Sequence, residues 1–332
     1  MENINSLNLL AKQKEILETC SLENVCYIDN KFKVYDKNLP AVITSKEYVS
    51  LPFDELVGSW GGTSDAGSSI ELQVRIKINN EYSKYFSYGK WALKQENLYY
   101  NQDDEKSRMF VDEILTKEGY EANGFQFRVI LENDASLRFV NIAIRAKGYQ
   151  SSVPNGNLPS HVYYEMPKYN QNIVPVIGHE MCSATTTAML LGFKGKLFDK
   201  EDKEFPHRYV ASLVADRGHN CPTYGNWVYN TVVIGHFGYD AYVKRLANWQ
   251  ELKYHLAKVG PVGASIRGET GLYHTGGHLL VVCGYKEVDG KTYVLCNDPN
   301  INERFKEGLF VYYEYPLEVF EKFWYGVIYA LE

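Results

Sequence analysis

The chain has 332 residues, more than a single hydrophobic core usually supports, and this length predicts two domains. Its composition is that of an ordinary globular protein, with 45% hydrophobic residues, 23% charged residues and a formal net charge of -6. No basic cluster is present that could neutralise phosphates, which argues against a nucleic-acid partner. No stretch approaches the roughly 18 apolar residues of a membrane span.

The N-terminal residues show neither the basic start nor the apolar run of a signal peptide. This predicts a cytoplasmic location, although a trimmed piece of a secreted protein would look the same. The six cysteines, at positions 20, 26, 182, 221, 283 and 296, form no CxxC pair and no framework spacing. They predict reduced thiols rather than disulfides or a zinc site, and neither a metal nor a cofactor is predicted.

Two apolar patterns divide the first 147 residues. Residues 6–22 carry apolar side chains at helical spacing, which predicts an amphipathic helix within an N-terminal helical or extended segment, 1–40. From 41 to 147 the apolar period is two, and polar turns separate the segments. Strands are predicted over 70–78, 125–131 and 139–147. The segment 41–147 is therefore predicted to be an antiparallel β-sandwich domain.

Trp60 and Trp91 fall within this sandwich. Large aromatic side chains usually fill a sandwich core, and this is the favoured interpretation of both tryptophans. The alternative is a platform for a glycan, so that a glycan or cell-wall contact through the domain stays open.

The second half begins with a segment rich in Ser, Pro, Gly and Asn, residues 148–162, which predicts a linker. The remaining residues, 163–332, show a mixed pattern. Helices are predicted over 182–193 and 248–258, and strands over 261–267, 278–286, 291–297 and 309–315. Helices followed by strands predict an α+β domain.

Cys182 is the candidate nucleophile. A free cysteine in an apolar segment is usually a small core residue, and Cys283 and Cys296 fit that interpretation within their strands. Cys182 differs because a helix is predicted to begin at it, where unpaired N–H groups and the helix dipole stabilise a thiolate.

His278 is the candidate base, at the start of a strand about a hundred residues after Cys182. The strand that follows ends in Asn297 and Asp298, and an Asp-Gly turn joins the two strands. In an unbulged hairpin Asn297 shares the face of His278, whereas Asp298 reaches it only if a bulge, for example at Gly284, shifts the register. Geometry therefore favours Asn297 and charge favours Asp298. The order Cys, His, then Asn or Asp is typical of papain-like cysteine enzymes.

Several motifs carry a family resemblance over residues 165–332: MPKYNQ, CSATTTAMLLGF, YGNWVYNTVVIGHFGYDAYV, GPVGASI, GGHLLVVCGY and CNDP. In this order they resemble cysteine peptidase family 39 and its peptidase-like bacterial relatives, which are related to bacteriocin leader peptidases. FDELVGSW, IELQVRIKI and YGKW likewise resemble the β-sandwich that precedes this domain in many bacterial members. The resemblance implies a papain-like peptidase domain over 163–332, with Cys182 as nucleophile, His278 as base, Asp298 as orienting acid and Gln171 as oxyanion-hole side chain.

Gln171 also has a physical argument, because its amide N–H₂ and the backbone N–H of Cys182 could stabilise a tetrahedral oxyanion. Ten residues lie between the two, a longer spacing than in the leader peptidases. Gly277, beside His278, would let a ligand approach the backbone, and Trp227 in the TYGNW segment is predicted to wall a subsite.

The predicted function is a cysteine peptidase that hydrolyses peptide or isopeptide bonds through a Cys182–His278–Asp298 triad and an acyl-enzyme. One alternative is an acyltransferase or amidase that uses the same thioester chemistry with another acceptor. Another is a non-catalytic protein that binds peptides or cell wall.

Overall fold

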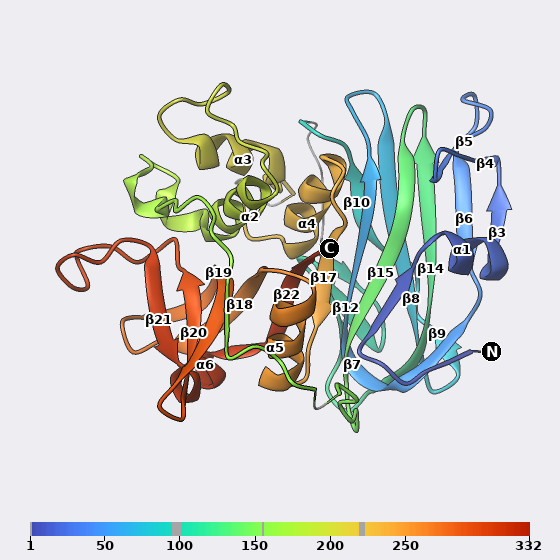
Figure 1. Ribbon diagram of the computed structural model, residues 1–332. Coiled ribbons are helices and arrows are strands. Elements are labelled where there is room, and N and C mark those ends of the chain that lie inside the picture. The colour runs from blue at the N-terminus through green and yellow to red at the C-terminus, as the bar shows by residue number, and fades with distance from the viewer. Residues whose placement is uncertain (1, 95–100, 155, 219–222) are drawn as a thin grey trace. The chain divides into compact units, whose positions relative to one another are not determined.

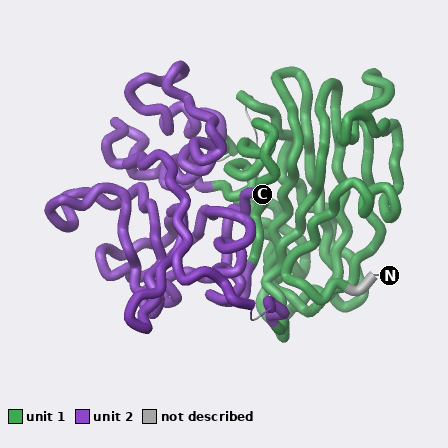
Figure 2. Tube along the Cα trace, in the orientation of Figure 1, with its two compact units in different colours: residues 1–150, 215–222, 226–245 green, residues 151–214, 223–225, 246–332 purple. Residues whose placement is uncertain are grey.

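The computed structural model describes residues 2–94, 101–154, 156–218 and 223–332 (Figure 1). The chain forms two compact units, which Figure 2 colours separately. Unit 1 comprises residues 1–150, 215–222 and 226–245, and unit 2 comprises residues 151–214, 223–225 and 246–332. The first boundary between the units falls within the predicted linker. His219 and Cys221 lie outside the described residues.

Unit 1 is rich in β-strands. They are β1 (Glu2–Ile4), β2 (Asn8–Ala11), β3 (Cys20–Glu23), β4 (Val25–Ile28), β5 (Lys31–Val34), β6 (Ala41–Ser45), β7 (Tyr48–Thr63), β8 (Ser69–Ile78), β9 (Glu81–Tyr82), β10 (Phe86–Trp91), β11 (Gln102–Asp103), β12 (Ser107–Phe110), β13 (Glu113–Thr116), β14 (Ala122–Glu132), β15 (Ser136–Ala146) and β17 (Ala241–Arg245). The unit also contains the helices α1 (Gln13–Thr19) and α4 (Trp227–His236).

The long strand β7 connects two ladders of this β-sandwich. Its first residues pair antiparallel with β14, and from Phe53 onward it pairs antiparallel with β15. Strand β14 in turn pairs with β8, in which buried and partly exposed residues alternate as the period-two pattern predicts. Trp60 and Trp91 are both 0% exposed, so they belong to the core.

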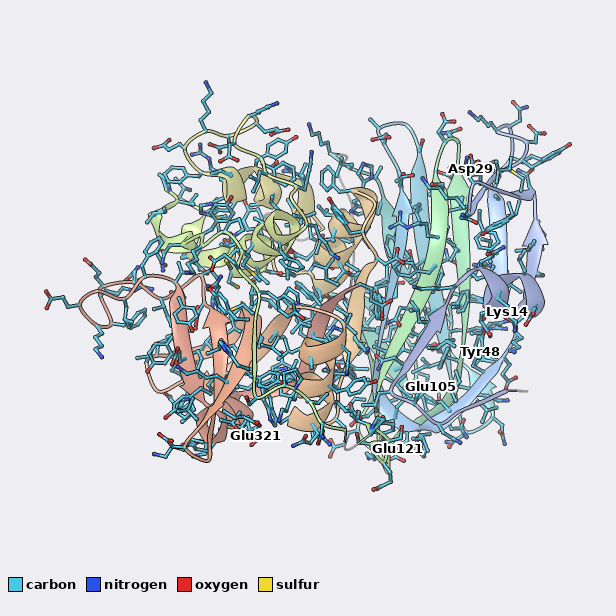
Figure 3. The ribbon with its side chains drawn as sticks, viewed as in Figure 1. Lys14, Asp29, Tyr48, Glu105, Glu121 and Glu321 are labelled. Atoms are coloured by element: carbon cyan, nitrogen blue, oxygen red, sulfur yellow. The ribbon has the colours of Figure 1, made fainter. Side chains whose placement is uncertain are left out.

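The N-terminal segment belongs to the sandwich. The helix predicted over 6–22 is shorter, because only Gln13–Thr19 is helical and strands β2 and β3 flank it. Strand β2 pairs with β15, and the pairing satisfies backbone groups that a longer helix would have used internally. Tyr48 (Figure 3) is fully buried against Phe125, and its hydroxyl donates to Glu15 of α1 at 2.8 Å.

Unit 2 has an α+β architecture. Its strands are β16 (His161–Tyr163), β18 (Val262–Glu269), β19 (His274–Val288), β20 (Lys291–Asn297), β21 (Tyr312–Pro316) and β22 (Trp324–Leu331). Its helices are the 3₁₀ turns η1 (Gln171–Ile173) and η2 (Gly178–Glu180), and the α-helices α2 (Cys182–Phe193), α3 (Pro206–Val214), α5 (Trp249–Lys258) and α6 (Leu317–Phe323). The antiparallel sheet has the order β22-β18-β19-β20-β21, and β16 pairs with the far end of β19.

Helix α2 is buried along almost its whole length and packs against α3, β18 and β19 (Figure 1). Its threonines are poor interior helix formers because their hydroxyls need partners. The hydroxyl of Thr185 has a partner within the same turn, because it donates to the Met181 carbonyl at 2.9 Å. Thr186 places its methyl group over Gly263, where a Cβ atom would lie only 3.0 Å from that methyl group.

The hairpin of β19 and β20 contains a bulge. Near the turn Gly284 pairs with Leu295, but beyond the bulge Val282 pairs with Cys296 and Val281 with Asn297. The extra residue on β19 shifts the register by one. Beyond Asn297 this shifted register continues to Asp298, which therefore points to the same face as His278.

Gly284 is essential to this bulge, and its replacement provides a test. A Cβ atom at this position would overlap the Val162 carbonyl oxygen of β16, a strand that is paired with β19 at this point. We expect Gly284→Ala to lower the free energy of unfolding by about 2–3 kcal/mol in urea denaturation. Gly290→Ala is the matched control, because a Cβ there meets no atom within 4 Å and costs only the strain of a positive φ, about 1–2 kcal/mol. Equal losses would contradict the packing argument.

Candidate active site

The four predicted catalytic residues all lie in unit 2. Cys182 is the first residue of α2, His278 lies in β19, Asp298 directly follows β20, and Gln171 begins η1. Cys182 is partly exposed, whereas the other three are 5% exposed or less. A helix N-terminus thus supplies the candidate nucleophile, and two neighbouring interior strands of the sheet supply the candidate base and acid.

His278 and Asp298 are in direct contact. The imidazole Nε2 lies 2.8 Å from the carboxylate Oδ1 of Asp298, and both side chains are buried. The backbone N–H of Asn300 donates to the same oxygen at 2.9 Å. Asp298 therefore lies against the imidazole of His278. The hairpin of β19 and β20 contains the bulge at Gly284 that places Asp298 on this face.

Asn297 occupies the other face of β20. The unbulged register favoured it as the partner of His278, and the bulge removes the basis of that argument. Asn297 is fully buried, and neither polar atom of its side chain has a hydrogen-bond partner among the described residues. An unpaired buried amide is costly, but we find no functional explanation for it.

The Cys182 thiol and the His278 imidazole form a hydrogen-bonded pair. Burial raises the pKa of the thiol, but the charge and hydrogen bond of His278 outweigh burial and leave this pKa below its ordinary value. Backbone hydrogen bonds from Leu279 and Ser183 act in the same direction. Because Nε2 faces Asp298, Nδ1 is the imidazole nitrogen available to the sulfur.

The imidazole is held in its charged form. Burial lowers the pKa of His278, but the charges of Asp298 and Cys182 raise it more, to about 10. Burial likewise raises the pKa of Asp298, and His278 together with its other donors brings it below the ordinary value. Both shifts favour a thiolate and an imidazolium held beside a carboxylate.

The other described cysteines with a shifted pKa behave in the opposite way. Burial raises the pKa of Cys20 to about 11, that of Cys283 to about 12, and that of Cys296 well above its ordinary value. Cys283 and Cys296 are fully buried in strands, as predicted for core residues. Cys182 is therefore chemically distinct among them.

Gln171 is tied to the segments that carry Asp298 and Cys182. Its backbone N–H donates to the Pro299 carbonyl at 2.9 Å, and its side-chain Nε2 donates to the Gly178 carbonyl at 2.8 Å. A Cβ atom on Gly178 would overlap the Gln171 carbonyl oxygen, so η1 and η2 approach each other closely only because this residue is glycine. One N–H of the amide remains for another acceptor.

The two predicted substrate-binding residues have different settings. Gly277 lies next to His278, where β19 has one residue more than the facing strand β18, and is exposed. A Cβ atom there would meet no atom within 4 Å, so packing does not require glycine. Trp227 begins α4 in unit 1, where its backbone N–H hydrogen-bonds to Asp112. Its predicted role as a subsite wall stays a prediction.

Sequence reasoning missed two tyrosines that contact Asp298. The hydroxyl of Tyr273 donates to Oδ2 at 2.6 Å, and that of Tyr315 donates to the same oxygen at 3.1 Å. Tyr273 lies between β18 and β19, and Tyr315 lies in β21. The chain contains 27 tyrosines, so no signal in the sequence separates these two from the rest.

The described residues show neither a metal-binding cluster nor a membrane-spanning helix. Within the described ranges, no group of three or more His, Cys, Asp or Glu side chains is arranged to hold a metal ion. None of the helices in those ranges has both the length and the apolar character of a membrane span.

Comparison with known proteins gives the family. Residues 163–329 match the model of the Peptidase_C39 like family, and residues 22–143 match that of the Peptidase C39 N-terminal domain. The chain therefore belongs to the Peptidase_C39 like family, whose members are of the cysteine-peptidase type. No curated protein matches the sequence. Among solved structures, digestive procathepsin L 3 of the Tenebrio molitor larval midgut is similar at 14% identity, over 55% of this chain and 72% of that chain, with a TM-score of 0.31.

The lowered pKa of Cys182 predicts selective alkylation. At pH 6 a sub-stoichiometric dose of iodoacetamide should label Cys182 and leave Cys20, Cys283 and Cys296 unmodified, because only a thiolate reacts at a useful rate. Intact-protein and peptide mass spectrometry locate the label. Cys182→Ala should abolish it, and His278→Ala should move the reaction toward pH 8.5, the ordinary range of a thiol. Uniform slow labelling of several cysteines in the wild type would rule out an activated thiolate.

Proposed function

We propose that this protein is a cysteine peptidase that cleaves peptide or isopeptide bonds through an acyl-enzyme. The observation that supports the proposal most strongly is the continuous contact from Cys182 through His278 to Asp298. A buried imidazole between a thiol and a carboxylate is the arrangement that makes a thiolate at neutral pH and returns a proton to a leaving group. Membership of the Peptidase_C39 like family agrees with this chemistry.

In the first half of the proposed reaction, the Cys182 thiolate attacks the carbonyl carbon of the scissile bond and forms a C–S bond. The carbonyl electrons move to the oxygen, which becomes an oxyanion. When the tetrahedral intermediate collapses, the C–N bond breaks and the His278 imidazolium gives its proton to the departing amine. The product of this half-reaction is a thioester on Cys182 together with a neutral imidazole.

In the second half, water takes the place of the amine. The neutral His278 removes a proton from water, the resulting hydroxide attacks the thioester, and the C–S bond breaks. The acid is released, and Cys182 returns to its thiolate beside an imidazolium. Asp298 keeps the imidazole oriented with Nε2 bound and Nδ1 directed to the sulfur throughout both steps.

The oxyanion is proposed to be stabilised by the backbone N–H of Cys182 and the side-chain amide of Gln171. The Cys182 N–H lies at the start of α2, where backbone N–H groups have no acceptor within the helix. The hydrogen bond from the Gln171 amide to the Gly178 carbonyl fixes the orientation of this amide. Gly178 precedes Cys182 by only four residues. The hydrogen of Nε2 that does not bind Gly178 is the one proposed to reach the oxyanion.

The alternatives are an acyltransferase and a binding protein. No contact among the described residues favours an amine over water as the acceptor, so hydrolysis is the function proposed here. A binding protein would have no need of a thiol whose pKa is lowered. Trp60 and Trp91 are buried and cannot stack on a sugar, so neither of them can form a glycan platform.

Peptide hydrolysis tests the proposal directly. A library of fluorogenic and isopeptide-linked substrates should contain members that the wild type cleaves and Cys182→Ala does not. We expect Asp298→Asn to lower kcat by about 10²- to 10⁴-fold, because the imidazolium loses its charged partner. Cleavage that persists in Cys182→Ala would rule out this nucleophile. A wild type that cleaves no library member although its Cys182 is selectively alkylated would contradict the peptidase assignment while leaving the thiolate established.

The pH dependence of cleavage follows from the two pKa shifts. Activity should rise as pH passes the lowered pKa of Cys182 and fall as pH passes about 10, where His278 loses the proton that the leaving group needs. Alkylation of Cys182 by iodoacetamide needs no imidazolium and should not fall on the alkaline side. A stopped-flow comparison of the two profiles checks this, and a parallel alkaline fall of both would contradict the assignment of His278.

Gln171→Ala tests the oxyanion proposal. Removal of one donor should lower kcat by about 10²- to 10³-fold and leave KM within a few-fold. Asn172→Ala is the matched control, because Asn172 also lies in η1 but its side chain points to Asn300. Alkylation of Cys182 forms no oxyanion and should be unchanged in Gln171→Ala. Equal effects of the two substitutions on kcat would assign Gln171 a structural role only.

A further inference from the structure

Tyr273 lies in a closed turn between β18 and β19. The backbone N–H and the hydroxyl of Thr270 both donate to the Tyr273 carbonyl, at 3.0 and 2.9 Å, and the Tyr273 N–H donates back to the Thr270 hydroxyl at 3.0 Å. Thr270 is only 1% exposed, and Gly271 allows the turn through a positive φ. This turn determines the direction of the Tyr273 side chain and does not depend on a long flexible loop.

The Tyr273 side chain contacts two members of the proposed triad. Its hydroxyl donates to Asp298 Oδ2 at 2.6 Å, and its ring meets the His278 imidazole edge to face, with centroids 5.8 Å apart and an interplanar angle of 90°. Its other neighbour is Phe305, whose ring centroid lies 5.4 Å away. Tyr273 itself is only half-buried, whereas Asp298 is fully buried. Tyr273 is thus partly open to solvent although it contacts a fully buried carboxylate.

The loop that follows Asp298 supplies a further donor. The backbone N–H of Asn300 donates to Asp298 Oδ1 at 2.9 Å, while the Tyr273 hydroxyl donates to Oδ2. Both carboxylate oxygens are therefore held by hydrogen bonds.

We propose that Tyr273 is a positioning residue of the active site: its hydroxyl orients the Asp298 carboxylate and its ring holds the His278 imidazole in the plane from which it serves Cys182. This inference rests on the proposed function, because it assigns Tyr273 a role in the same triad. With two hydroxyls on Oδ2, the carboxylate cannot rotate without breaking both bonds, and Oδ1 stays directed at the imidazole.

Four titratable groups among the described residues act on Asp298. They are His278 from β19, Tyr273 from the turn, Tyr315 from β21 and the thiol of Cys296 from β20. Burial and the Asp298 charge raise the pKa of Tyr273 far above its ordinary value, so its hydroxyl stays a donor. Only His278 carries a positive charge in this set. Each hydroxyl that donates to the carboxylate therefore helps it to remain ionised beside the imidazolium.

Tyr315 provides a matched control. It donates to the same carboxylate oxygen, but its bond is longer, 3.1 Å against 2.6 Å. Its ring packs against Tyr313 and Phe323 instead of the imidazole. Tyr315→Phe thus removes a hydroxyl from Asp298 without disturbing the ring contact with His278, whereas Tyr273→Ala removes both interactions of Tyr273.

The experiment measures the pH profile of Cys182 alkylation and the peptide kinetics of Tyr273→Phe, Tyr273→Ala and Tyr315→Phe. Loss of the Tyr273 hydroxyl raises the pKa of Asp298, weakens its support of the imidazolium and so raises the pKa of Cys182. We expect Tyr273→Phe to move the acid limb of alkylation upward by about 0.5 to 1 pH unit and to lower kcat about 3- to 10-fold with KM unchanged. Tyr273→Ala should lower kcat about 100-fold, and Tyr315→Phe should shift the limb less than Tyr273→Phe.

The outcomes separate this inference from the peptidase proposal. Wild-type alkylation profiles in both Tyr273 variants, or an effect on KM or thermal stability alone, would overturn the positioning role. A larger shift in Tyr315→Phe than in Tyr273→Phe would also overturn it. If no library peptide is cleaved but the acid limb shifts as expected, the role of Tyr273 stands and the peptidase assignment fails.

Discussion

The candidate active site depends on a fully buried carboxylate. Asp298 is 0% exposed, and an isolated buried carboxylate would become protonated rather than bear the cost of desolvation. Four groups prevent this: the His278 imidazole and the Asn300 N–H at one oxygen, and the hydroxyls of Tyr273 and Tyr315 at the other. Every acceptor direction of the carboxylate is thereby used, and removal of a partner would leave an unpaired charge in the interior.

These donors come from four separate parts of unit 2. His278 lies in β19, Tyr315 in β21, Tyr273 in the turn before β19, and Asn300 in the loop after β20. The central antiparallel sheet brings strands distant in the sequence into fixed register, which no single loop could do. The lowered pKa of the Cys182 thiol follows from this arrangement, because it derives from His278, whose own pKa the charge of Asp298 raises.

Much of this arrangement could be predicted from the sequence, and the reasons for success and failure are physical. The strands around Ile70 and Phe127 were predictable because one buried face imposes a period of two. Helix α2 was predictable as an apolar run, whereas the short helix α1 was predicted too long because its ends pair in the sheet. Tertiary pairing of this kind leaves no local pattern.

Within the site, the residue types and their order pointed to Cys182 and His278, because thiol and imidazole chemistry is specific to few residues. The partner of the imidazole was open between Asn297 and Asp298, and only the position of a bulge decides which of them reaches it. Tyr273 could not be predicted at all. Its role depends on three-dimensional proximity, and tyrosine is common in this chain for ordinary packing reasons.

The bulge at Gly284 determines which residue at the end of β20 faces His278, so the site depends on the register between β19 and β20. Loss of the bulge at unchanged hairpin length would pair Val282 with Asn297 and present the neutral Asn297 to the imidazole in place of Asp298. Deletion of the one extra residue of β19 would also remove the bulge, but it would keep Val281 opposite Asn297 and leave Asp298 on the face of His278. Removal or insertion of one residue from each strand beside the Asp289-Gly290 turn would leave the carboxylate where it is. Related chains that keep this chemistry can therefore differ in the length of the hairpin only by even numbers of residues, unless they move or lose the bulge.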